Sequence, residues 1–217
     1  MLERSLIGVV RVARCHVRSV RHLAARCASP RRGRPVPEGN PTFQQQVDAL
    51  VGQPMGSGNI APDPVNLPMI RHWTAAFDDH NPVYLDPEAA APRFGAIVAP
   101  PMMLQTWTMP TPMIEGIGER GGSPTPITET SPLTLFDEAG FTGTLASNSE
   151  FEIERYLRLG DVVSSSSTVE SISEEKQTRL GPGHFVTWVT TFRDEDGEVV
   201  GRQRFRVLKF KPAGEAG

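Results

Sequence analysis

Apolar and polar residues alternate along four segments in the second half of the chain, residues 150–157, 162–172, 184–192 and 199–210. A period of two is typical of strands that bury one face. The sequence Asp-Glu-Asp-Gly at 194–197 predicts a hairpin turn between the last two strands. The second half of the chain is therefore expected to form an antiparallel sheet.

The first half shows helical spacing instead. Ile70, Trp73 and Phe77 recur at the spacing of one helix face, and Pro68 suits the first turn of that helix. The Asp-Pro pair at 86–87 predicts a second helix start, with the aspartate as its cap. Two helices are therefore expected before the sheet.

A third apolar segment differs because its apolar residues cover more than one face. Those residues are Met102, Met103, Leu104, Trp107 and Met109. A helix with this pattern is buried on all sides, so residues 101–109 are expected to form a central helix against the sheet. The stretch 110–134 is rich in Pro and Gly, has no apolar period, and is expected to be a long loop of the kind that often covers a functional site.

Length and charge limit the classes of protein to consider. With 217 residues and 38% hydrophobic content, the chain can form one good core. Residues 1–37 contain nine Arg and one acid, so the remainder holds 13 of the 22 basic and 24 of the 25 acidic residues, a formal charge of −11. A body this acidic argues against a nucleic-acid partner, because neutralising phosphates requires a basic face.

The Arg-rich leader 1–37 has three interpretations that stay open. Its scarcity of acids resembles a transit peptide, and a basic amphipathic stretch also suits an anionic lipid surface. A mis-assigned upstream start codon yields the same kind of disordered, low-information sequence, and we favour this interpretation. The apolar run 6–10 is too short to span a bilayer or form a secretory core, so we expect a cytoplasmic protein without a membrane partner.

Cysteine and histidine positions argue against a metal centre. Both cysteines, Cys15 and Cys27, lie in the leader, so no disulfide, thiolate site or cysteine nucleophile is expected in the body. The body's histidines, His72, His80 and His184, are too few and too scattered to predict a metal cluster.

Two short segments carry a resemblance to a known family. Residues 79–86 read Asp-His-Asn-Pro-Val-Tyr-Leu-Asp, and residues 98–102 read Val-Ala-Pro-Pro-Met. Together they resemble the signature of MaoC-like (R)-specific enoyl-CoA hydratases, in the fatty-acid-synthase-type dehydratase family. That signature is Asp-x-Asn-Pro-Ile-His-x-Asp, followed by Ile-Ala-Pro-Gly-Met at the start of a buried helix. Asp79 and Asn81 match it, whereas Tyr84 stands in place of the catalytic His and Pro101 in place of Gly.

Each departure removes a group that hydration of a conjugated enoyl thioester needs. In the resembled family, Asp and His activate water, and the backbone N–H of the Gly donates to the thioester oxygen. Tyrosine, with an ordinary pKa of about 10, is a poor base at neutral pH, and proline has no N–H. Losing one oxyanion donor alone costs about 10²–10³ in rate. No catalytic residue is therefore assigned in the degenerate motif Asp79, Asn81, Tyr84, Pro101, and the chain alone is expected to be inactive.

Four further segments, 66–70, 135–141, 180–185 and 206–213, resemble one branch of this family. The branch is the MaoC-like part of the large, degenerate subunit of the actinobacterial steroid side-chain enoyl-CoA hydratase. It implies an α+β class with a single hot-dog fold, in which an antiparallel sheet wraps around a central buried helix.

The same resemblance gives the expected domain organisation. It consists of the leader 1–37, a lead-in segment 38–65, the hot-dog domain 66–213 and a tail 214–217.

The resemblance also implies partners. A small MaoC-like hydratase subunit with intact Asp and His supplies the chemistry, while this chain helps to form a pocket for a steroid-CoA. The substrate carries coenzyme A, so no separate cofactor is implied. Large subunits of the branch often carry a zinc-ribbon/OB-fold module that docks an aldolase, here expected as a separate protein or on a longer form of the chain. Two alternatives stay open, a self-sufficient hydratase that uses Asp79 with His80 or Tyr84, and an acyl-CoA-binding or aldolase-anchoring scaffold module.

Seven residues are candidates for substrate contact, namely Asp79, Tyr84, Gly95, Val98, Met102, Met103 and Trp107. The resemblance places the connection around 94–100 near the acyl-thioester, and methionine is pliable enough to line a pocket for a bulky apolar group. Each candidate also has a plainer interpretation. Asp79 suits a turn, Tyr84 fills the volume that a His would occupy, and the methionines with Trp107 suit an ordinary core.

Three cations, Arg155, Arg158 and Lys176, are candidates to meet the phosphates of CoA. Surface charges are more often simply solvated, so this assignment is an expectation only.

Overall fold

The structure, a computed structural model, describes residues 41–109 and 131–212. The expectations for the leader 1–37 with its cysteines, for most of the loop 110–134 and for the tail 214–217 lie outside these residues. No helix in the described ranges is long and apolar enough to cross a membrane.

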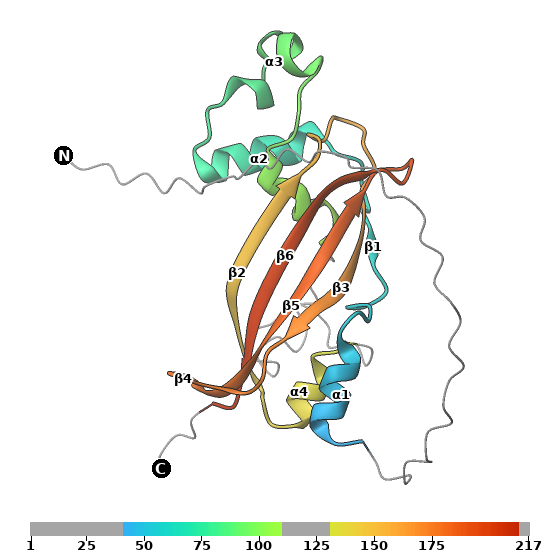
Figure 1. Ribbon diagram of the computed structural model, residues 1–217. Coiled ribbons are helices and arrows are strands. Elements are labelled where there is room, and N and C mark those ends of the chain that lie inside the picture. The colour runs from blue at the N-terminus through green and yellow to red at the C-terminus, as the bar shows by residue number, and fades with distance from the viewer. Residues whose placement is uncertain (1–40, 110–130, 213–217) are drawn as a thin grey trace, which may run out of the picture. The chain divides into compact units, whose positions relative to one another are not determined.

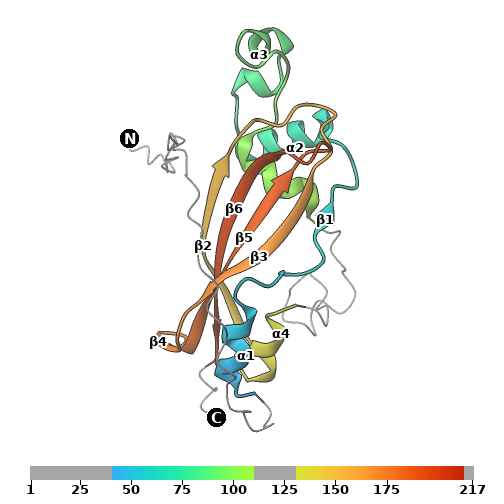
Figure 2. The same cartoon turned by 45° about the vertical axis from the view of Figure 1, so that its right-hand side comes forward.

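A six-stranded antiparallel sheet is the largest element of the described chain. Its strands in spatial order are β1 (Asn59–Ile60), β3 (Ser164–Ile172), β5 (Gly181–Arg193), β6 (Val199–Phe210) and β2 (Gly143–Ile153), and the short β4 (Lys176–Thr178) pairs with β5. Figures 1 and 2 show the sheet curling along its length. The predicted α+β class with an antiparallel sheet is confirmed.

The strand bounds agree with the prediction to different degrees. β6 has the predicted bounds, and β3 and β5 differ from theirs by a few residues. The hairpin at 194–197 is confirmed, because Gly197 N–H donates to the Asp194 carbonyl at 3.1 Å. β2 instead covers 143–153 rather than the predicted 150–157, since its first half is exposed on both faces and shows no apolar alternation.

The first helices of the described chain begin at polar caps that accept from their first N–H groups. Within the lead-in segment 38–65, α1 (Phe43–Leu50) begins with a capping box formed by Thr42 and Gln45. Asn66 caps α2 (Leu67–Phe77), and Asp86 caps α3 (Pro87–Phe94), as the Asp-Pro pair predicts. A one-turn helix, η1 (Pro82–Tyr84), and α4 (Thr134–Glu138) were not predicted.

The apolar face predicted for α2 is only partly right. Ile70 and Thr74, one turn apart, are the buried positions, whereas Trp73 is half-buried. Phe77 is 65% exposed and packs on the Trp73 ring, with 4.5 Å between ring centroids. The apolar stripe therefore enters the core at Ile70 and leaves it toward Phe77.

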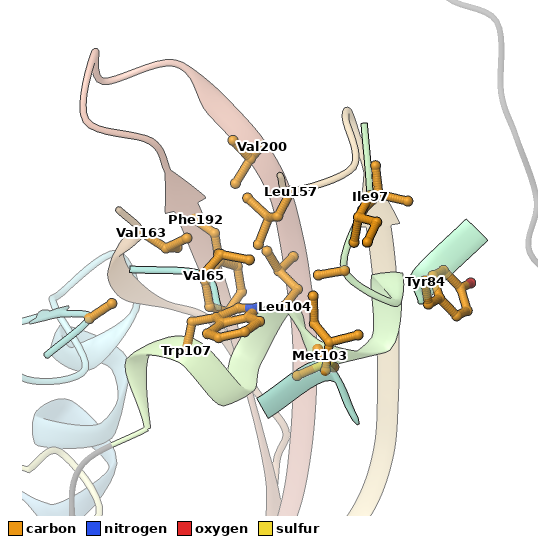
Figure 3. Close-up of a cluster of buried hydrophobic side chains, with 14 of the residues drawn as sticks. Val65, Tyr84, Ile97, Met103, Leu104, Trp107, Leu157, Val163, Phe192 and Val200 are labelled. Atoms are coloured by element: carbon orange, nitrogen blue, oxygen red, sulfur yellow. The ribbon is translucent and has the colours of Figure 1, made fainter. Parts of the chain in front are cut away.

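The central segment is a 3-10 helix, η2 (Pro101–Thr108), and the prediction of burial on all sides is wrong. Three residues per turn place Leu104 and Trp107 on one ridge, and both are buried, together with Met103 (Figure 3). Met102 is 49% exposed and Met109 59% exposed. η2 thus covers the sheet with one side and presents its other side outward.

Two hydrophobic clusters lie at opposite ends of the sheet. The first joins η2 and α2 to the sheet through Ile70, Leu104, Phe192 and Val200 among others. The second lies under α1 and α4 and contains Val47, Phe136, Phe141, Val186 and Val207. The motif segment 79–102 belongs to the first cluster, which therefore positions the candidate site.

A glycine allows η2 to approach the sheet. A Cβ added to the buried Gly201 of β6 would lie 2.7 Å from Leu104 Cδ2 and 2.7 Å from the Glu152 carbonyl oxygen. Such short contacts are not tolerated, so the missing side chain lets Leu104 rest on the floor of the sheet.

Replacing this glycine therefore tests the packing of η2. Gly201→Ala is expected to lower the free energy of unfolding by about 1–3 kcal/mol through overpacking, measured by urea denaturation of the full chain. Ser171→Ala, at an exposed position of β3, is the control and is expected to change stability by less than about 0.5 kcal/mol. Wild-type stability of Gly201→Ala would contradict the close approach.

Candidate functional site

The first motif segment forms a tight turn between α2 and α3. Asp78 ends α2 in the left-handed conformation with a φ of 53°. The Asp79 carboxylate accepts from the Asn81 backbone N–H at 3.0 Å, and the Asn81 side chain accepts from Val83 N–H at 3.4 Å. One oxygen of Asp79 is thus engaged in the turn itself.

Tyr84 is the buried residue of this turn and is 8% exposed. Burial raises the pKa of its phenol, the nearby Tyr156 and Asp79 raise it further, and the Asn81 side chain offsets part of the shift. Figure 3 shows the ring beside the first cluster with the hydroxyl pointing away from it. At neutral pH Tyr84 is therefore protonated, and it can donate a hydrogen bond but not act as a base.

His80 does not replace the missing histidine. Its side chain is 86% exposed and its Nε2 lies 2.9 Å from the carboxylate of Asp78, which is 91% exposed. This pair lies in solvent, whereas the position that the family gives to its histidine is occupied by the buried Tyr84.

The second motif segment is held by the loop after β2. Gly95 ends α3 with a φ of 78°, and its N–H donates to the Ala91 carbonyl. Ala99 N–H then donates to the Leu157 carbonyl at 2.8 Å, and Val98 pairs with Arg158 in an isolated bridge. This pairing fixes the connection that leads into η2.

The start of η2 offers no backbone donor at its first two positions. Pro100 caps it and Pro101 is its first residue, so neither has an N–H. The carbonyl of Pro100 accepts from Met103 N–H at 2.9 Å, which closes the first turn. The backbone donor that the family signature places at Gly is absent here because the residue is proline.

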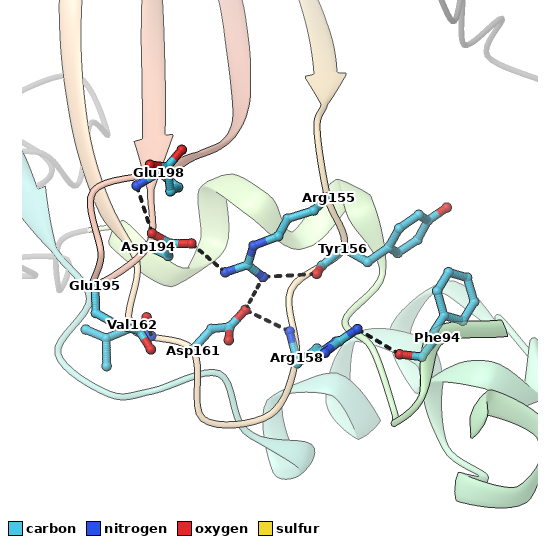
Figure 4. A network of polar contacts seen from close by, with 9 residues as sticks. All are labelled: Phe94, Arg155, Tyr156, Arg158, Asp161, Val162, Asp194, Glu195 and Glu198. Carbon is cyan, nitrogen blue, oxygen red and sulfur yellow. Dashed lines mark hydrogen bonds and ion pairs between the residues drawn. The ribbon is translucent and has the colours of Figure 1, made fainter. Parts of the chain in front are cut away.

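A network of charges joins three loops beside this segment (Figure 4). The Arg155 guanidinium contacts Asp161 at 2.6 Å and Asp194 at 2.8 Å, and both carboxylates are largely buried. The hydrogen bond from Arg155 lowers the pKa of Asp194 below its usual value. Arg158 donates to the carbonyl of Phe94 at the end of α3, at 3.0 Å. The network therefore fixes α3 against the loop after β2 and the β5–β6 turn.

Two adjacent hollows lie along this network. The larger, of about 490 Å³, is lined by Arg93, Phe94, Val98, Arg155, Tyr156, Arg158, Asp161, Asp194, Glu195 and Asp196. The smaller, of about 10 Å³, lies against Pro100 and Pro101. Both share Arg155 and Tyr156, so the hollows meet at these two side chains.

The structure separates the predicted site residues into groups. Val98 lines the larger hollow, while Met103 and Trp107 are buried in the first cluster and Met102 is exposed. The indole N–H of Trp107 has no hydrogen-bond partner among the described residues. Lys176 lies on β4. In Figure 1, β4 is at the end of the sheet opposite to α3, so Lys176 does not join Arg155 and Arg158.

Sequence reasoning missed Arg93 and Tyr156, and it placed Phe94 only within the connection around 94–100. Arg93 lies over the Phe94 ring at 5.1 Å, and the Phe94 and Tyr156 ring centroids are 4.9 Å apart. The Arg-Phe-Gly sequence at the end of a helix was the only sequence signal for these residues. The contact between Phe94 and Tyr156 could not be predicted from it, because it depends on tertiary pairing.

The curled sheet, η2 and the motif between α2 and η2 define a fold of the dehydratase class. Residues 49–203 match the family model described as the FAS1-like dehydratase domain region, and the chain belongs to this MaoC-like/FAS1 dehydratase family. The family is therefore the one that the motif resemblance indicated.

Two curated relatives share the matched region. The chain is 44% identical over 179 residues to a probable enoyl-CoA hydratase alpha subunit of Thermomonospora curvata, covering 78% of this chain and 52% of the relative. It is 39% identical over 173 residues to the 3-oxo-4,17-pregnadiene-20-carboxyl-CoA hydratase alpha subunit of Mycobacterium tuberculosis, covering 79% and 53%. The chain thus spans about half the length of the curated relatives it matches.

A solved structure supports the fold. The crystal structure of the ChsH1-ChsH2 complex from Mycobacterium tuberculosis contains a chain that matches with a TM-score of 0.67 and 37% identity. The match covers 80% of this chain and 94% of that chain. The predicted hot-dog fold is confirmed.

The environment of Tyr84 can be tested directly because the chain contains only two tyrosines. The tyrosinate absorbance that is lost in Tyr84→Phe is expected to titrate with a midpoint above pH 10.0, because burial raises this pKa. The folded state holds the proton more tightly than the unfolded state, so wild-type stability should fall relative to Tyr84→Phe as pH rises above 10.0. Tyr156→Phe is the control, and a Tyr84 midpoint at or below 10.0 would contradict the burial.

Proposed function

We propose that this chain is a non-catalytic, pocket-forming subunit of a heteromeric enoyl-CoA hydratase that acts on a steroid side-chain enoyl-CoA. The observation that carries the proposal is the pair of substituted positions. Tyr84 is buried with a raised pKa and cannot serve as a base, and Pro101 has no N–H for the thioester oxygen. A partner with intact Asp and His supplies the base, and the donor to the thioester oxygen likewise comes from the partner's backbone.

The relatives support this assignment. Both are named as alpha subunits of hydratases, and the name of one specifies a pregnadiene carboxyl-CoA. The solved structure that matches is a complex of two proteins. A heteromer in which one subunit has lost its catalytic groups explains why a chain with a degenerate motif keeps the dehydratase fold.

A self-sufficient hydratase fits the geometry less well. It would need Asp79 with His80 or Tyr84, but His80 is exposed and paired with Asp78. One Asp79 oxygen is engaged by Asn81 N–H, and Tyr84 is held protonated. No contact in the described residues specifically favours the scaffold alternative.

The lone chain is therefore expected to hydrate enoyl-CoA substrates poorly or not at all. Activity on 3-oxo-4,17-pregnadiene-20-carboxyl-CoA should appear when a small MaoC-like subunit with intact Asp and His is co-expressed, measured by loss of enoyl absorbance. The small subunit alone is the control. Turnover by the lone chain within about tenfold of the mixture would overturn the non-catalytic assignment.

A second experiment separates the two missing groups. Tyr84→His restores a base but leaves the thioester oxygen without its donor, and Pro101→Gly restores only the donor. Each single variant should stay nearly inactive without the partner, and only the double variant can gain measurable hydration. Misplacement of about 1 Å costs on the order of 10²-fold, so the gain is expected to be small.

The four chains, wild type included, are compared in the same absorbance assay. Their melting temperatures are measured first, to confirm that each variant is folded. Substantial activity of Tyr84→His alone would show that Pro101 does not remove the oxyanion donor.

A further inference from the structure

The two edges of the sheet differ in how they are covered. On the β3 side, three backbone N–H groups of the segment 52–61 donate to carbonyls between residues 163 and 169, each at 2.8 Å. Gly58 lets this segment lie close, because a Cβ there would be 2.7 Å from the Ser165 carbonyl oxygen. On the other side lies β2, and no strand in 41–109 or 131–212 pairs with its outer edge (Figure 1). Within the described residues, one edge is therefore closed and the other is open.

β2 lacks most of the features that keep edge strands from pairing. An edge presents a row of unpaired N–H and C=O groups, and short length, Pro or Lys commonly protects it. β2 is 11 residues long and contains neither Pro nor Lys. Its bulge lies between Ala146 and Asn148, where the Ser147 hydroxyl donates to the Arg206 carbonyl at 3.1 Å. The stretch 148–153 beyond the bulge is regular, and it is the part of the edge that can accept another strand.

The two faces of this stretch have different chemistry. Phe151 is half-buried, packs on the first cluster and lies opposite Gln203. The Gln203 side chain donates to Gln105 of η2 at 2.6 Å, so Phe151 is on the face that η2 covers. Glu150 and Glu152 point to the other face, with side chains 58% and 66% exposed. A strand that continues the sheet must therefore place apolar residues beside Phe151 and basic residues beside the glutamates.

Arginines of β6 contact these glutamates but hold other carboxylates more closely. Arg204 makes two bonds of 2.8 Å to Glu170 and reaches Glu150 at 3.3 Å. Arg202 lies 3.3 Å from Glu152 and 2.8 Å from a second glutamate along the chain. Each arginine is thus shared between two acids, and the edge keeps an acidic face.

A second copy of this chain fits the edge poorly. Residues directly opposite each other in an antiparallel pair share a face. A two-fold axis that pairs most of 148–153 with its own copy must therefore pass beside Glu150 or beside Phe151. The first register places Glu150 opposite its own counterpart, and the second places Glu150 opposite Glu152. Like charges directly opposite destabilise the pair, so the edge disfavours a copy of itself.

We propose that β2 is the edge through which this chain pairs with the catalytic subunit, and that Glu150 and Glu152 select a partner strand in which apolar and basic residues alternate. The existence of that subunit rests on the proposed function, whereas the place and chemistry of the surface rest on the sheet edge. The loop after β2 is bound to the start of η2, because Ala99 N–H donates to the Leu157 carbonyl. Pairing at β2 therefore brings the partner to the end of the sheet that carries the degenerate motif.

Hydrogen exchange tests the location of this surface. The full chain is measured alone and with a small MaoC-like subunit that has intact Asp and His. Amides on the outer side of β2 are expected to exchange at least about tenfold more slowly in the complex, because they gain partners there. Amides of the covered β3 edge are expected to change little and serve as the internal control. A complex in which β2 exchanges as fast as in the lone chain would overturn the surface.

Charge-neutral variants test the selection of the partner. Glu150→Gln combined with Glu152→Gln keeps the side-chain shapes and is expected to weaken partner binding by about tenfold. The affinity of this double variant should also depend less on salt, because screening acts on the charges that it lacks. Glu174→Gln with Glu175→Gln makes the same charge change at exposed positions before β4 and is the matched control. Wild-type affinity and salt dependence of the β2 double variant would overturn selection by these glutamates.

The lone chain tests the rejection of a second copy without any partner. In analytical ultracentrifugation, the β2 double variant is expected to self-associate about tenfold more strongly than the wild type, because the opposed charges are gone. The control with changes at 174 and 175 should behave like the wild type. A wild-type dimer whose β2 amides are protected from exchange would contradict the rejection.

The outcomes separate this inference from the proposed function. An active complex with unprotected β2 amides removes the edge interface but keeps the hydratase. A complex that protects β2 yet does not hydrate the pregnadiene carboxyl-CoA removes the proposed hydratase but keeps the interface.

Discussion

The two consecutive prolines at the start of η2 constrain both the packing of the chain and its chemistry. Pro100 and Pro101 fix two backbone angles and contribute no N–H. The chain after them closes into a 3-10 helix whose three-residue turn directs Leu104 and Trp107 toward the sheet. The same prolines leave the entrance of the helix without the donor that stabilises a developing oxyanion. One local constraint therefore shapes the fold and removes a backbone donor.

Charge is distributed unequally around that entrance. Arg155 contacts both Asp161 and Asp194 and so joins the loops that carry them, and its hydrogen bond lowers the pKa of Asp194. The Arg93 guanidinium lies over the Phe94 ring, and the Arg158 side chain donates to the Phe94 carbonyl. Arg155, with its two carboxylate partners, is therefore the arginine that holds these loops together by ion pairs.

Sequence patterns predicted the parts of this fold in which one chain segment carries its own signal. β6 and the helix cap at Asp86 emerged with the right positions because alternation and capping are local. β2 was misplaced because an exposed edge strand needs no apolar period. η2 was judged buried on all sides because composition does not reveal a turn of three residues, in which Met102 faces outward.

The candidate site shows the same limit. The substituted positions Tyr84 and Pro101 were visible as departures from a motif, and their chemistry followed from residue type alone. The larger hollow was not visible, because Phe94 and Tyr156 are 62 residues apart in the chain and meet only when the loop after β2 pairs with the segment before η2. Arg155 and Arg158 were identified as cations, but only the fold shows that Arg155 contacts two carboxylates whereas the Arg158 side chain donates to a carbonyl.

The residues at the two substituted positions of the motif are compatible with the packing of the fold. A catalytic histidine at the position of Tyr84 would have to keep a polar ring partly desolvated for the sake of the reaction, and such polar burial is costly. Tyr84 places a larger, mainly apolar ring against the first cluster and directs its hydroxyl away from it. Proline at position 101 likewise restricts the unfolded chain and so favours the folded state. Both residues are therefore compatible with a stable fold, which the proposed role of a non-catalytic subunit requires.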